Sequence, residues 1–154
     1  IPTIDRTPVF AEKAVAAFDR LLGRFPEGKY AAQARVDRKE AQDWIARHIL
    51  EVGAYYYRQG DYWASWGRCM MVLDGFRETE QADRALYYLG KTYFFLEEND
   101  KAKEVFEDHL AHFPQSPYQE RVEEYLADLR GEGFSINKTY RRFKERTLFY
   151  FGYE

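Results

Sequence analysis

The chain has 154 residues, 45% of them hydrophobic and 32% charged, and its formal net charge is −3. This composition is typical of a folded globular protein, and the negative balance argues against a broad nucleic-acid-binding surface. The single cysteine, Cys69, excludes an internal disulfide, and no apolar run approaches the ~20 residues of a membrane-spanning helix. The opening stretch, "IPTIDRTPVF" from Ile1, carries no signal peptide, so we expect a mature product or a fragment.

Helical periodicity runs through almost the whole chain, and strand-like alternation is nearly absent before the last few residues. Between residues 62 and 75, the apolar part of the expected helix consists of Ala64, Met71, Val72 and Leu73. Proline or glycine ends most of the expected helices, and "EEND" separates the run at 80–97 from the run at 101–112. Pro117 is placed to open the last helix. The predicted helices cover approximately residues 8–24, 29–58, 62–75, 80–97, 101–112 and 117–130.

One phrase occurs three times: an aromatic residue, a proline or its substitute, a few turn formers and then a fresh helical run. It begins at Phe25 ("FPEGKYAAQA"), Phe76 ("FRETEQADRA") and Phe113 ("FPQSPYQERV"). The intervals of 51 and 37 residues indicate a helical repeat with an insertion in the first interval, which we expect to be a longer helix around residues 37–44. The middle phrase has Arg77 in place of proline, so we expect a softer boundary there, with an extra turn of helix.

The spacing of large and small residues resembles the tetratricopeptide repeat, in which two helices per repeat cross at small residues and aromatic side chains fill the space between pairs. The best-matching unit has Leu86, Leu89, Gly90, Tyr93, Ala102, Phe106 and Pro114 at the spacings of the pattern, and only His109 departs from it. The resemblance implies an all-α fold, a tetratricopeptide-repeat helical array (α-solenoid) of about six to seven antiparallel helices.

We expect residues 1–133 to form this array and residues 134–154 to form a separate tail or capping segment. The first unit is incomplete and contributes its second helix only, full units lie at about 46–79 and 83–116, and a last helix lies at 117–130. Because one pair of helices cannot bury its own apolar face, we expect upstream repeats in the parent protein. The tail carries a net charge of +3 and the aromatic run "LFYFGY", and both capping of the array and contact with a partner or with membrane headgroups remain open for it.

The stretch from Val52 to Arg68, "VGAYYYRQGDYWASWGR", makes the resemblance specific to one family of repeat proteins. Together with the earlier "AFDRLLGRFPEGKYAAQA", it is similar to the BamD family, the tetratricopeptide lipoproteins of the bacterial outer-membrane β-barrel assembly machine. The resemblance covers residues 5–130 and implies a non-enzymatic scaffold, without cofactors, on the periplasmic side of the outer membrane. Its implied partners are the POTRA domains of the barrel-forming subunit, other assembly lipoproteins and nascent outer-membrane proteins. Nucleic acid is not an expected partner, and the membrane is expected only through a lipid anchor outside this chain.

The same resemblance implies a partner-binding site around the turn between the second and third helices. In the family, a basic residue before the turn glycine and an Asn-Arg pair after it lie at the contact with the POTRA domain. Arg68 matches the arginine, Gly67 replaces the asparagine, and Gln59 replaces the basic residue beside Arg58. The two tryptophans of the third helix beside Arg68 have a composition typical of binding hot spots, and packing against neighbouring helices is the alternative for both. The expected partner-binding residues are Arg58, Gln59, Trp63, Trp66, Gly67 and Arg68.

The sequence gives weaker indications of other functions. A different adaptor, from the cell envelope or the cytosol, would bind extended peptides in its concave face through first-helix residues such as Tyr55, Tyr88 and Lys91. His109 and His112 lie three residues apart on one helix, but no third ligand is evident, so we expect no metal site. The sequence contains no phosphate-binding glycine loop, GxSxG or HExxH motif, and we expect no enzyme. We expect Cys69 to be a small buried residue.

Overall fold

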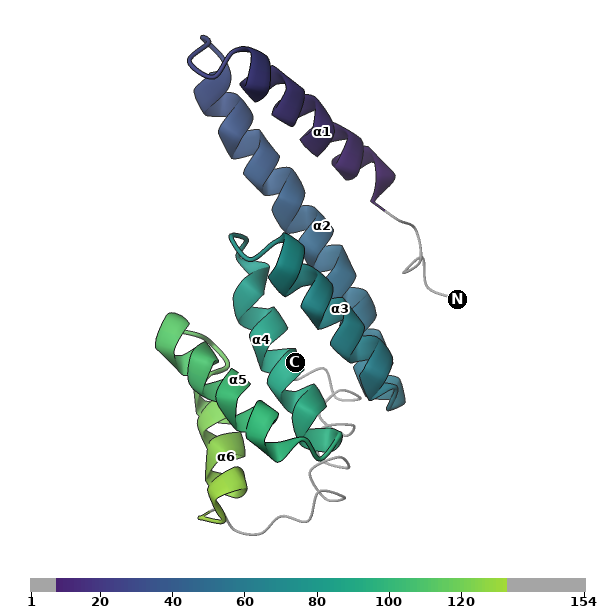
Figure 1. The fold of residues 1–154 in the computed structure, drawn as a ribbon, viewed down its shortest axis with the longest axis vertical. Helices are drawn as coiled ribbons and strands as arrows, with labels where there is room; N and C mark the ends of the chain where they lie inside the picture. The colour runs from purple at the N-terminus through teal and green to yellow at the C-terminus, as the bar shows by residue number, and fades with distance from the viewer. Residues whose placement is uncertain (1–7, 133–154) are drawn as a thin grey trace.

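The structure, a computed structural model, describes residues 8–132 and consists of six α-helices joined by short turns (Figure 1). The helices are α1 (Val9–Arg24), α2 (Ala31–Gln59), α3 (Tyr62–Gly75), α4 (Gln81–Phe95), α5 (Asn99–His112) and α6 (Gln119–Arg130). No strand occurs within residues 8–132, and the predicted all-α helical array is confirmed. The expected tail, residues 134–154, lies outside the described residues.

Each helix packs against the next one in the chain, and α2 also contacts α4. Figure 1 shows α1 and the first half of α2 as a projecting hairpin, with α3 to α6 gathered along and beyond the second half of α2. Within residues 8–132, no helix is both long and apolar enough to cross a bilayer.

Helix α2 explains the longer of the two repeat intervals. It runs without a break over 29 residues, about 44 Å, so the predicted longer helix around residues 37–44 is present. Its buried residues are concentrated in the second half, where α3 and α4 cover it. The division into units at 46–79 and 83–116 stays a prediction.

The core is closely packed where α4 crosses α5. A Cβ added at Gly90 would lie 2.4 Å from Cε1 of Phe106, so only glycine lets the two helices approach this closely. The Phe106 ring is fully buried and stacks on Tyr125 of α6, with 5.1 Å between ring centroids. Cys69, at the position that matches Phe106 one repeat earlier, is likewise fully buried. The repeat therefore placed these core positions correctly.

All three aromatic phrases fold into the same turn. The aromatic residue ends the helix, and its carbonyl oxygen accepts a hydrogen bond from the N–H three residues further on. The pairs are Gly28 to Phe25 (3.1 Å), Thr79 to Phe76 (3.0 Å) and Ser116 to Phe113 (3.1 Å). The predicted softer boundary at Arg77 is wrong: α3 ends at Gly75, one residue before the aromatic, as in the other copies. Backbone hydrogen bonds hold this turn, and the residue at position 77 is not part of them.

The last turn differs from the prediction in one detail. Helix α6 begins at Gln119, so Pro117 lies in the turn two residues before the helix and does not open it. The Tyr118 N–H donates to Oγ of Ser116 at 3.0 Å, which ties the start of α6 to the preceding turn. A side-chain hydroxyl thus organises the helix start that proline was expected to provide.

Candidate functional site

The predicted site surrounds the two-residue turn between α2 and α3. Gly60 ends α2 in the left-handed conformation, with φ of 82°, which glycine adopts without steric cost. Asp61 then caps α3, because its carboxylate oxygen accepts a hydrogen bond from the Ala64 N–H at 3.0 Å. The turn reverses the chain, so that α3 runs back along the second half of α2.

Gly53 on α2 fixes the position of Arg68 on α3. A Cβ at Gly53 would lie 3.0 Å from Cβ of Arg68, so the glycine allows the stem of the arginine to pack directly on the α2 backbone. Beyond the stem, Nη1 of Arg68 lies 4.0 Å from the sulfur of Met71. Among residues 8–132, no carboxylate forms an ion pair with Arg68. The guanidinium is therefore positioned by its stem while its charge is open to a partner.

The two tryptophans of α3 have different environments. The Trp63 side chain is 63% exposed and meets the ring of Trp66 edge to face, with 6.1 Å between centroids. Trp66 is half-buried, and its indole N–H donates to the hydroxyl of Tyr93 on α4 at 2.8 Å. Trp63 is available for binding, whereas Trp66 joins α3 to α4.

The remaining predicted residues lie on both sides of the turn. Gln59 is exposed at the end of α2, and Arg58 beside it is half-buried. Gly67 lies in the middle of α3, and a Cβ added there would have no atom of residues 8–132 within 4 Å apart from its chain neighbours and the backbone of its own helix. Trp63, Gly67 and Arg68 therefore share α3, while Arg58 and Gln59 belong to the last turn of α2.

Sequence reasoning missed Met71 as a surface residue. It was predicted to belong to the apolar part of α3, but its side chain is 49% exposed, whereas Val72 beside it is fully buried. Met71 lies two turns after Trp63, which places both on one side of the helix. That spacing is the signal that could have identified Met71 as exposed, because the neighbouring Val72 marks the buried side of the helix.

The first-helix residues of the alternative adaptor function lie largely inside the protein. Tyr88 is 5% exposed, Lys91 is fully buried, and Tyr55 is half-buried. The Lys91 ammonium lies 4.5 to 5.0 Å from the ring centroids of Tyr57, Tyr87 and Tyr88, within the range of cation–π attraction. Tyr88 and Lys91 are therefore packed residues in this structure, and they offer little surface to a peptide.

Cys69 fits its predicted role as a small buried residue. Burial raises the pKa of its thiol to about 12, which keeps it protonated and a poor nucleophile at neutral pH. The hydrogen bond from Ser65 and the charge of Arg84 act in the opposite direction and are outweighed.

His109, the one departure from the repeat pattern in its unit, belongs to a polar network between α4, α5 and the turn before α6. Its Nε2 lies 2.6 Å from Oδ1 of Asp83, and the hydroxyl of Ser116 donates to the same oxygen at 2.7 Å. The three side chains have the composition of a catalytic triad, but Ser116 donates to the carboxylate and the histidine does not stand between them. Within the described part of the chain, no group of three potential metal ligands occurs.

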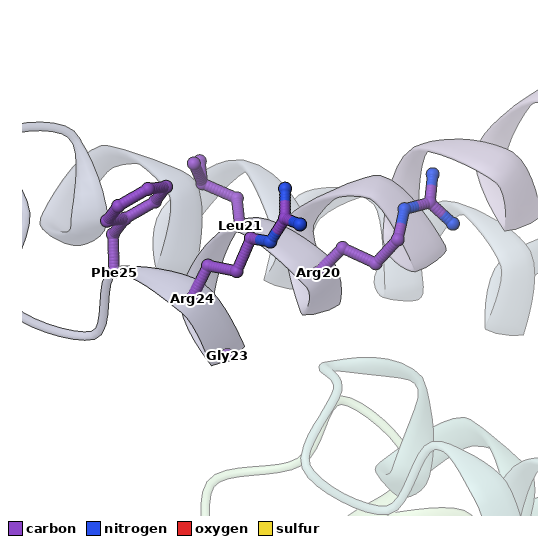
Figure 2. Close-up of a pocket in the computed structure, with 5 residues that line it drawn as sticks. All are labelled: Arg20, Leu21, Gly23, Arg24 and Phe25. Carbon is purple, nitrogen blue, oxygen red and sulfur yellow. The ribbon is translucent and has the colours of Figure 1, made fainter.

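A shallow pocket of about 450 Å³ opens at the end of α1, away from α3. Figure 2 shows the residues that line it, with Arg20 and Arg24 one turn apart on the helix and the Phe25 ring beyond its end. No carboxylate among residues 8–132 pairs with either arginine. The exposed side chains of Leu21 and Phe25 make this end of α1 apolar as well as basic.

Comparison with known proteins relates the chain to a family. The family model for an outer membrane lipoprotein, YfiO, matches residues 2–105, which include all of α1 to α4. The outer membrane protein assembly factor BamD of Neisseria gonorrhoeae is 29% identical over 114 residues, which cover 74% of this chain and 43% of the relative. BamD of Caulobacter vibrioides is 28% identical over 103 residues, covering 67% of this chain and 34% of the relative.

A third relative, BamD of Rickettsia prowazekii, is 25% identical over 114 residues, covering 74% of this chain and 45% of its own length. The chain thus spans less than half the length of these relatives. The match to the family model nevertheless covers well over half of the chain and includes every residue of the α2–α3 site. The chain therefore belongs to the YfiO family of outer membrane lipoproteins.

Proposed function

We propose that this chain is part of an outer-membrane protein assembly factor and that the exposed side of α3 docks onto a POTRA domain of the barrel-forming subunit. The curated relatives carry the name of such an assembly factor, which supports the general role. The observation that carries the docking site is Arg68. Its stem is held against Gly53, and within residues 8–132 its guanidinium has no carboxylate partner.

The chemistry of the site favours an acidic partner residue. A guanidinium offers a planar fork of N–H groups that matches a carboxylate in bidentate geometry. Beside it, Trp63 and Met71 supply exposed apolar area, which excludes water from the ion pair once a partner covers it. The side chains of Arg58 and Gln59 extend the proposed contact across the turn.

The proposal also covers the kind of role, which is non-catalytic, and the location of the protein. The chain acts as a scaffold that holds the barrel-forming subunit on the periplasmic side of the outer membrane. Other assembly lipoproteins and nascent outer-membrane proteins are further proposed partners, for which the described residues suggest no particular surface. No step of bond making or breaking is assigned to the Asp83, His109 and Ser116 network, because its hydroxyl is directed at the carboxylate.

Arg68→Glu tests the proposal. We expect the dissociation constant for the purified POTRA domains of the same organism to rise roughly 30-fold or more, since the variant places two negative charges together. Isothermal titration calorimetry measures the affinity, and circular dichroism checks that helicity is unchanged. Arg20→Glu on α1 is the matched control, since Arg20 also has no ion pair among the described residues.

The outcomes separate the proposal from the adaptor function. Equal affinities for the wild type and Arg68→Glu would remove α3 from the contact. A wild-type chain that binds no POTRA domain, but binds extended peptides and loses them on Tyr55→Ala, would favour the adaptor instead. The burial of Tyr88 and Lys91 argues against that result.

A further inference from the structure

We draw no further inference here: the strongest candidate, the exposed apolar and basic surface at the end of α1 around Arg20, Arg24 and Phe25, is an unpartnered helix face, and nothing among the described residues shows what covers it.

Discussion

Helices α1 and α4 have almost the same length but opposite environments. Eleven of the 15 residues of α4 are buried, including residues on all sides of the helix. None of the 16 residues of α1 is buried, and α2 is its principal packing neighbour among the described helices. In a repeat array each element is stabilised by the elements on either side, so a helix with neighbours on both sides becomes core and an edge helix does not.

This contrast between α1 and α4 indicates where the array tolerates amino-acid substitutions. Substitutions in or against α4 alter contacts with α2, α3 and α5 together, because all three pack on it. Substitutions on the outward side of α1 alter contacts with solvent alone, within the described residues. The α3 site lies between these extremes, with buried residues such as Cys69 beneath exposed ones such as Trp63.

Phe106→Ala should have the largest effect on stability. The ring fills the space over Gly90 and stacks on Tyr125, so its removal leaves a cavity at the junction of α4, α5 and α6. We expect the free energy of unfolding to fall by about 3–5 kcal/mol. Urea denaturation followed by circular dichroism measures the change, and a loss below about 1 kcal/mol would show that the junction collapses into the cavity.

Gly90→Ala tests the same junction from the other helix. The added methyl group would overlap the Phe106 ring, which is fully buried and stacked on Tyr125, and we expect a loss of about 1–3 kcal/mol despite the better helix propensity of alanine. The double variant Gly90→Ala with Phe106→Leu should recover part of the loss, since leucine leaves room for the methyl group. A Gly90→Ala protein as stable as the wild type would contradict the tight crossing, and so would a double variant that shows no recovery relative to Phe106→Leu alone.

The helices were predictable from the sequence because their ends depend on local signals. The aromatic turns and Gly60 placed the boundaries close to the observed ones, and the repeat pattern placed Cys69 and Phe106 in the core. The error at Arg77 arose because proline was taken as the cause of the turn, whereas backbone hydrogen bonds hold it. Proline is compatible with this turn without being required by it.

Non-local contacts account for what the sequence did not reveal. His109 departs from the repeat pattern because Asp83, 26 residues earlier, lies 2.6 Å away in the fold. Met71 is a different case: it was assigned to the apolar part of α3 from its apolar character alone, although its spacing from Trp63 and the buried Val72 beside it indicate the exposed side. The partner-binding residues came from a resemblance, and the open space at Gly67 became visible only when the surroundings of each glycine could be compared.

Phe10→Ser on α1 should have the smallest effect. The Phe10 side chain is 87% exposed, and its described contact is the ammonium of Lys13, 5.9 Å from the ring centroid. An exposed pair of this kind contributes little, so the free energy of unfolding should change by less than about 0.5 kcal/mol. Urea denaturation of this variant beside Phe106→Ala compares an edge aromatic residue with a core one in a single experiment. A loss above about 1 kcal/mol that grows with protein concentration would mean that another copy of the chain covers α1.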